Sequence, residues 1–237
     1  MLLCYLIKKL SSVSFFCPAY YDEKNLPELI PRVFKFLSEI ADKFEIIIIE
    51  DGSPDKTGAV ADGLARHYPG IKVIHHSCNL GYGATLKEGF RAAGYDYIIY
   101  TDGDNQYDIF EIKPHLFLLK EAAVLSGYVT EKAVTTLRKF QSLTFNWLVA
   151  TLFSVKIKDI NCALKVYKRR VLENIEMKSN SAFIDAEMLI KSQKAGFLIA
   201  QFPVTHYRRQ HGLAGGSRPG LIFQTIKDMI KFRLGLL

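Results

Sequence analysis

Two aspartates directly after an apolar run are the first residues of this chain that could carry chemistry. Asp102 and Asp104 flank Gly103, and Gln106 follows two residues later. Oxygen ligands at this spacing can meet one hard divalent cation, and a glycine between them lets the backbone turn tightly. The alternative is an acidic turn that merely closes a strand, since Asp-Gly is a common turn dipeptide. The spacing therefore predicts a metal site, which needs support from elsewhere in the chain.

Two further acidic loops give that support. One contains Asp22, and the other begins with Glu50 and Asp51 directly after an isoleucine run. Acidic groups crowded together are costly unless a cation or a hydrogen-bonding ligand is present. Asp51 is placed to accept hydrogen bonds from a ribose or a base, and as a cleft-facing carboxylate it is expected to contribute little to stability. Tyr20 is open to two interpretations, a ring that stacks on a base or another core aromatic.

The elements that must position these loops alternate along the chain. β-rich runs and helical patterns follow one another at Ser12–Phe16, Asn25–Ala41, Glu45–Ile49, Lys56–Tyr68, Lys72–His75, Tyr82–Ala93 and Tyr97–Thr101. Such alternation predicts an α/β domain with a mainly parallel sheet flanked by helices, and ligands of these sheets bind beyond the carboxyl ends of the strands. The glycines of NLGYGAT lack the third glycine of a dinucleotide fingerprint, so we expect them to pack a helix start closely against the sheet.

Composition excludes several classes of protein. The chain has 237 residues, a formal net charge of +7 and 49% hydrophobic residues, which argues for a globular core rather than disorder. Its four cysteines have no disulfide or zinc-site spacing, and no apolar run approaches the roughly 20 residues that span a bilayer. The basic balance fits a phosphate-bearing partner, but the basic residues lack the interleaved aromatics of a nucleic-acid platform, so no nucleic acid is expected.

Five ordered motifs resemble one known family. They are PAYYDEKNL from Pro18, EDGSPDKT from Glu50, NLGYGATLKEGF from Asn79, TDGDNQYD from Thr101 and DINCALKVYKRRVL from Asp159. The chain resembles the family-2 inverting glycosyltransferases, in particular the branch of dolichyl-phosphate mannosyltransferase and other polyprenyl-phosphate sugar transferases. The likeness runs from about Ser11 to Arg218.

The resemblance implies a single-domain GT-A fold, a Rossmann-like sheet that holds a GDP- or UDP-sugar together with Mg²⁺ or Mn²⁺. It implies a polyprenyl phosphate as the acceptor. By position in the motifs it assigns residues to the nucleotide sugar, namely Pro18, Tyr20, Asp22, Ile49, Asp51, Asp102, Gly103, Asp104, Arg209 and Arg218. It assigns the metal to Asp102, Asp104 and Gln106. One departure is that Tyr128-Val129 follows Gly127 where the family commonly has an arginine, whose role would pass to Lys132, to Arg138 or to no residue.

The acceptor decides whether a base is needed. A lipid phosphate is already an anion, whereas a sugar hydroxyl must lose a proton to a carboxylate. Asp185 and Glu187 are the candidates for that carboxylate, and compensation of the helix dipole is the alternative for both. Lys165 offers a cation near the acceptor loop.

Three segments are expected along the chain. Residues 1–10 form an N-terminal extension, residues 11–218 the GT-A domain, and residues 219–237 an amphipathic helix suited to a membrane surface. The predicted enzyme is thus cytoplasmic, at the cytoplasmic face of a membrane. Two alternatives stay open: a family-2 transferase acting on a sugar or polysaccharide hydroxyl, and a non-catalytic nucleotide-sugar-binding protein.

Overall fold

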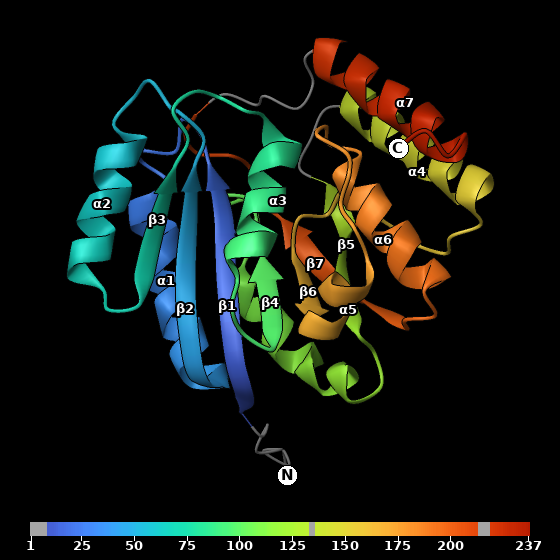
Figure 1. The fold of residues 1–237 in the computed structure, drawn as a ribbon. Coiled ribbons are helices and arrows are strands. Elements are labelled where there is room, and N and C mark those ends of the chain that lie inside the picture. The colour runs from blue at the N-terminus through green and yellow to red at the C-terminus, as the bar shows by residue number, and fades with distance from the viewer. Residues whose placement is uncertain (1–8, 133–135, 213–218) are drawn as a thin grey trace.

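A computed structural model describes residues 9–132, 136–212 and 219–237. In the described chain, seven strands form one sheet in the order β3-β2-β1-β4-β6-β5-β7 (Figure 1). The strands are β1 Leu10–Ala19, β2 Ala41–Glu50, β3 Ile71–His75, β4 Tyr97–Tyr100, β5 Val124–Lys132, β6 Lys165–Lys168 and β7 Ile199–His206. Among these described strands only β6 runs antiparallel to its neighbours, β4 and β5, so the predicted mainly parallel sheet is confirmed.

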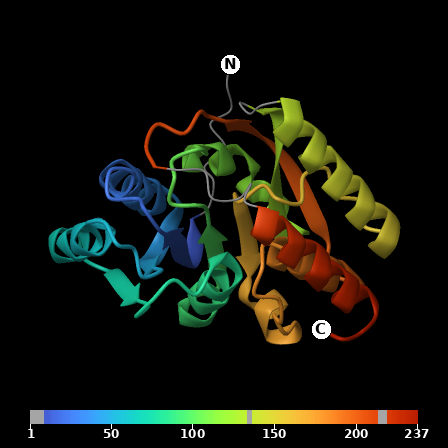
Figure 2. The same ribbon diagram turned by 90° about the horizontal axis from the view of Figure 1, so that it is seen from above.

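Helices cover both faces of the sheet (Figure 2). One face packs against α1 Leu26–Ile40, α2 Thr57–His67 and the 3₁₀ helix η1 Ile109–Lys120. The other packs against α3 Tyr82–Ala92, α5 Arg169–Asn174 and α6 Ile184–Lys194, with α4 Thr136–Phe153 and α7 Pro219–Arg233 joined to α6 at its outer side. The expected helices of the first half begin and end within one residue of those observed.

The isoleucine run of β2 explains why two cores form. Ile46 and Ile48 pack into the core beneath α1, whereas Ile47 and Ile49 pack into the core beneath α3. Side chains alternate between the two faces of a strand, so a continuous apolar run is what a strand buried on both faces requires. This confirms the burial predicted from the sequence.

The glycines of α3 act differently from the prediction. A Cβ on Gly89 would lie 2.2 Å from the Phe16 ring, so Gly89, near the end of the helix, is the residue that lets α3 approach the sheet. A Cβ on Gly83 would lie 2.4 Å from the backbone of Asn180 instead. The helix start therefore packs on the loop before α6, because that loop crosses its first turn.

None of the helices among the described residues has the length and apolar character that crossing a bilayer requires.

Candidate active site

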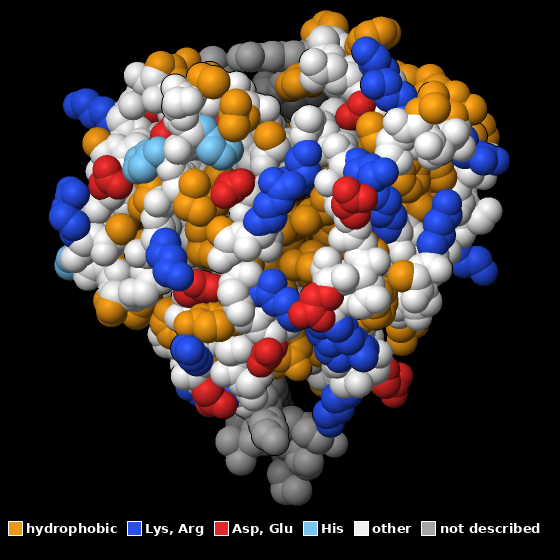
Figure 3. All heavy atoms as spheres, in the orientation of Figure 1, with side chains coloured by type: hydrophobic (Ala, Val, Ile, Leu, Met, Phe, Trp, Pro, Cys, Tyr) orange, Lys and Arg blue, Asp and Glu red, His pale blue; other side chains and the backbone are white. Residues whose placement is uncertain are grey.

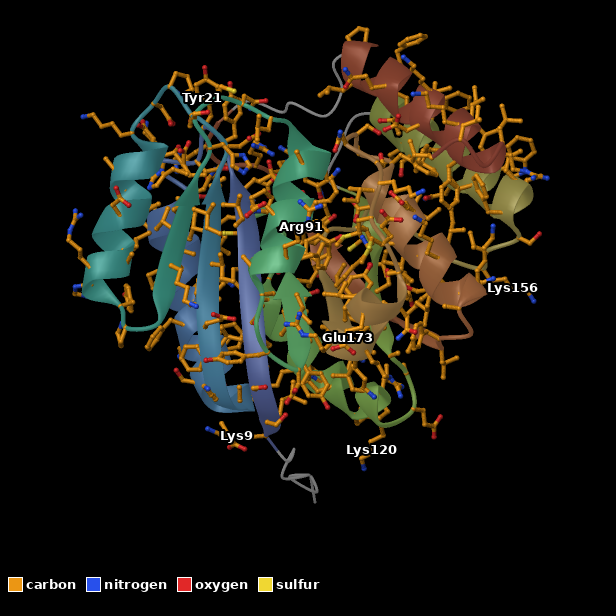
Figure 4. All side chains as sticks on the ribbon, viewed as in Figure 1. Lys9, Tyr21, Arg91, Lys120, Lys156 and Glu173 are labelled. Atoms are coloured by element: carbon orange, nitrogen blue, oxygen red, sulfur yellow. The ribbon has the colours of Figure 1, made fainter. Side chains whose placement is uncertain are left out.

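The carboxyl ends of β1 and β4 approach each other closely at one edge of the sheet. A Cβ on Gly103 would lie 2.7 Å from the Pro18 carbonyl oxygen and 3.1 Å from Asp22 Oδ2. The tight turn is made at Asn105, which has a φ of 57°, and not at Gly103 as predicted. Glycine is required at position 103 because there is no room for a side chain. Figure 4 shows Tyr21 at this edge and Lys9 and Lys120 at the opposite edge.

Four aspartates interact electrostatically at this edge. Burial, followed by the neighbouring charges of Asp104 and Asp185, raises the pKa of Asp102 to about 8. Burial also raises the pKa of Asp22, and Asp104 adds to that rise. Crowded carboxylates disfavour one another's ionised forms, and a bound cation reverses this effect. Two of the three acidic loops therefore converge as expected, and they are joined by Asp185 from α6.

Arg209 reaches the same carboxylates from the other end of the chain. Its guanidinium forms a close ion pair with Asp104. Gln106 sets up this contact, because its backbone carbonyl accepts from Tyr207 N at 2.9 Å and its side-chain Nε2 donates to the Tyr207 carbonyl at 3.0 Å. The Gln106 side-chain nitrogen thus holds the end of β7 against the site. The Gln106 Oε1 atom is left to bind a metal.

The first two carboxylates of the third acidic loop, those of Glu50 and Asp51, point away from the cluster. Asp51 is buried, its Oδ1 accepts from Leu80 N at 2.8 Å and lies 2.7 Å from His76 Nδ1, and its Oδ2 accepts from Gly81 N at 3.0 Å. Glu50 contacts the Ser53 amide and lies 3.1 Å from His75 Nδ1. These contacts argue against the expectation that Asp51 contributes little to stability, because its carboxylate holds the loop that leads into α3.

Two residues assigned to the nucleotide differ in their surroundings. Ile49 has no exposed surface and belongs to the core beneath α3, so its side chain cannot contact a ligand. Tyr20 is 37% exposed and packs edge-on against Tyr21 with ring centroids 4.7 Å apart. A cavity of about 380 Å³ lies beside these rings, lined by Tyr21, Glu23, Lys24, Asp55, Gln210, His211 and Gly212. The interpretation of Tyr20 as a core aromatic is therefore wrong.

The two candidate bases of α6 have separate surroundings. Asp185 Oδ1 accepts from Lys165 Nζ at 2.6 Å and contacts the Tyr100 hydroxyl, and Asp185 Oδ2 lies 3.3 Å from the Tyr82 hydroxyl. Glu187 has no exposed surface. Its oxygens accept from the amides of Lys178 and Ser179 and from Lys191 Nζ. The geometry thus gives Glu187 a structural role, that of ordering the loop before α6.

Two tyrosines and one lysine, Tyr82, Tyr100 and Lys165, also belong to the site, and the sequence did not predict that they lie together. The Tyr82 hydroxyl lies 3.1 Å from Asp102 Oδ1, and Lys165 Nζ lies 3.0 Å from the Tyr100 hydroxyl. Tyr82 lies between Gly81 and Gly83, and this glycine spacing predicts close backbone packing but says nothing about a functional hydroxyl. The side chains of Lys132 and Arg138 and the whole of Arg218 lie outside the described part of the structure.

The donor set suits a hard cation. Asp102 and Asp104 supply carboxylate oxygens, and Gln106 Oε1 adds an amide oxygen, all of which Mg²⁺ and Mn²⁺ accept. Across the described ranges, no group of three or more His, Cys, Asp or Glu side chains is arranged to hold a metal ion. A cation held by these three oxygens would complete its coordination with water or with the oxygens of a diphosphate.

Comparison with known proteins decides the family. The family model described as Glycosyl transferase family 2 matches residues 14–176. The chain belongs to glycosyltransferase family 2. The expected GT-A fold is supported by a solved structure of similar fold. It is glucosyl-3-phosphoglycerate synthase from Mycobacterium tuberculosis in complex with Mn²⁺, UDP and glucosyl-3-phosphoglycerate. That structure superposes with a TM-score of 0.73 at 18% identity, covering 96% of this chain and 81% of the other.

Curated relatives of this family-2 chain span different lengths. Glycosyltransferase AglD of Haloferax volcanii is 31% identical over 81% of this chain, which spans 32% of that protein. Dolichyl-phosphate beta-glucosyltransferase ALG5A of Trichomonas vaginalis is 29% identical over 81% of this chain, and this chain spans 64% of that protein. Polyprenol monophosphomannose synthase of Mycolicibacterium smegmatis is 30% identical, with 83% of this chain and 78% of that protein aligned.

Proposed function

We propose that this family-2 protein transfers a sugar from a nucleotide-diphosphate sugar to a polyprenyl phosphate, with a divalent cation and with inversion at the anomeric carbon. The observation that carries the proposal is the cluster of Asp102, Asp104 and Arg209 at the carboxyl edge of the sheet. Two acids that could share a cation and one arginine that could pair with phosphate suit a diphosphate. The names of the dolichyl- and polyprenol-phosphate relatives support the acceptor.

The proposed reaction exchanges one bond for another. An acceptor phosphate oxygen attacks the anomeric carbon, and the bond from that carbon to the diphosphate oxygen breaks on the opposite side. Held by Asp102, Asp104 and Gln106, a cation such as Mg²⁺ or Mn²⁺ would act as a Lewis acid for the departing diphosphate. Arg209 leaves Asp104 and adds a second positive group beside the phosphates, as cationic clamps do at other departing phosphates.

The surroundings of Asp185 favour a phosphate acceptor over a hydroxyl acceptor. Asp185 is buried, and the Lys165 ammonium group is bonded to it at 2.6 Å. Both Asp185 oxygens are already engaged, Oδ1 with Lys165 and the Tyr100 hydroxyl and Oδ2 with the Tyr82 hydroxyl, so neither is free to act as a base toward an acceptor. A sugar hydroxyl needs such a base, whereas an anionic phosphate needs none. Asp185 therefore suits a structural anchor in this reaction better than a proton acceptor.

Two exposed apolar stripes support contact with a membrane surface. Phe140, Leu143 and Trp147 follow one another at helical spacing on α4, and each is more than 60% exposed. Exposed apolar side chains also follow one another at helical spacing on α7, at Phe223, Ile226 and Ile230, and exposed Leu234 directly follows the helix. In Figure 3 orange side chains gather at the corner where α4 and α7 lie. Basic residues beside these stripes complement an anionic bilayer, as in other helices that lie at an interface.

The test is a transfer assay with purified protein. UDP- and GDP-sugars are incubated with Mn²⁺ or Mg²⁺ and a short polyprenyl phosphate, and products are identified by mass spectrometry. We expect a lipid-phosphate sugar from one donor class, lost in excess chelator and in Asp104→Asn, which removes one charged ligand. Transfer only to sugar hydroxyls would replace this acceptor with the alternative one. Donor binding without any transfer would favour a non-catalytic sugar-nucleotide-binding protein.

A further inference from the structure

A lysine without any exposed surface lies next to the carboxylate cluster. Lys165 is on β6, and three acceptors surround its Nζ: Asp185 Oδ1 at 2.6 Å, the Cys162 carbonyl at 2.6 Å and the Tyr100 hydroxyl at 3.0 Å. An ammonium group has three protons to donate, so this set satisfies it completely. Lys165 therefore has no donor left for a substrate phosphate, contrary to the expectation of a cation for the acceptor.

The partner of Lys165 leads back to the metal site. Asp185 has one oxygen on Lys165 and the other 3.3 Å from the Tyr82 hydroxyl. That hydroxyl lies 3.1 Å from Asp102 Oδ1. Four side chains from β6, α6, α3 and the end of β4 thus form one continuous path from the buried ammonium group to Asp102. Burying this ion pair costs desolvation free energy. An apolar pair of similar volume in its place would often leave the stability unchanged or raise it.

We propose that Lys165 is a positioning residue for the metal site. Its ammonium group fixes Asp185, and the Tyr82 hydroxyl carries that placement to Asp102. This inference rests on the proposed function, because it assumes that Asp102 binds a cation. Partners behind a metal ligand orient it, and their loss typically weakens metal affinity or activity by 10- to 100-fold. The tight contact between Gly83 and the Asn180 backbone holds the first turn of α3, and with it Tyr82, in place.

Two variants separate positioning from charge balance. Tyr82→Phe removes only the hydroxyl that joins Asp185 to Asp102. The double variant Lys165→Met with Asp185→Asn removes both charges of the buried pair together, so that no lone charge is left in the core. Lys168→Met is the matched control, since Lys168 is on the same strand but donates to the Leu119 carbonyl at 2.6 Å, away from the cluster.

Mn²⁺ alone is the probe, and free Mn²⁺ is followed by electron paramagnetic resonance, with urea unfolding as the measure of folding. We expect the dissociation constant for Mn²⁺ to rise about tenfold or more in Tyr82→Phe and in the double variant, and to stay at the wild-type value in Lys168→Met. If the double variant does not fold, Tyr82→Phe alone decides.

Wild-type Mn²⁺ affinity in a folded Tyr82→Phe or in a folded double variant would overturn the inference and leave the proposed function intact. A wild-type protein that transfers sugar but binds no Mn²⁺ would overturn the inference and the metal site together. Absence of transfer with normal Mn²⁺ binding would count against the proposed function alone, because the metal affinities still test the path from Lys165 to Asp102.

Discussion

Replacing Asp51 by alanine tests the structural role of the β2 loop. The carboxylate is 5% exposed and accepts hydrogen bonds from the amides of Leu80 and Gly81. Hydrogen bonds to a charged group contribute roughly 1.5–3 kcal/mol each. The lower value applies because Leu80 is at the surface, where water replaces part of the loss. We therefore expect Asp51→Ala to lower the free energy of unfolding by about 3 kcal/mol.

Urea unfolding and thermal melting measure this loss. For a chain of this length 1 kcal/mol corresponds to roughly 2–4 °C in melting temperature, so a decrease of about 6–12 °C is expected. The matched control is Asp62→Ala, which removes an aspartate paired with His75 at 3.1 Å but 46% exposed, with an expected change below about 0.5 kcal/mol. Unchanged stability of Asp51→Ala together with weaker nucleotide binding would refute this reasoning. Asp51 would then be a residue that binds the nucleotide-sugar donor.

Three further changes have expected outcomes. Gly103→Ala places a Cβ 2.7 Å from the Pro18 carbonyl oxygen, so we expect weaker Mn²⁺ binding and a loss of about 1–3 kcal/mol in urea unfolding; normal values in both would contradict the close approach. Iodoacetamide at pH 8 should modify exposed Cys78 much faster than Cys162, whose pKa burial raises to about 12; equal rates by mass spectrometry would show that the site opens. Replacing three basic residues of α7 by glutamate should weaken binding to phosphatidylglycerol vesicles more than 100-fold, at about 1 kcal/mol per residue. A control variant with three lysines at the opposite edge of the sheet replaced by glutamate should bind the vesicles normally. Equal loss of binding in both variants would show that α7 has no specific role. The α7 set is Lys227, Lys231 and Arg233, and the control set is Lys9, Lys113 and Lys120.

Local sequence patterns predicted the fold well because each strand and helix of the first half has its own apolar pattern. The isoleucines of β2 are apolar on both faces, and that alone identifies a strand buried on both sides. Strand and helix patterns then alternate at a spacing that only a mainly parallel sheet accommodates. The acidic loops could be assigned to one edge for the same reason, since parallel strands end on the same side.

The directions of individual side chains could not be predicted in this way. Asp185 and Glu187 are two residues apart on a helix, so they point to different sides, and the sequence does not say which side faces the site. Asp51 turns toward Leu80 and Gly81 because the next loop presents two unpaired amides there. Such a choice depends on hydrogen-bond partners that are distant in the sequence and come near only in the folded chain.

The ion pair between Asp104 and Arg209 joins residues that are 105 positions apart. The family-2 match ends at residue 176, so it includes both aspartates of the loop after β4 but neither Asp185 nor Arg209. During synthesis the two aspartates would emerge and fold beside each other long before their basic partner from the end of β7 arrives. The repulsion between the two aspartates therefore lacks a basic partner until β7 has joined the sheet, and a cation bound before then would relieve it.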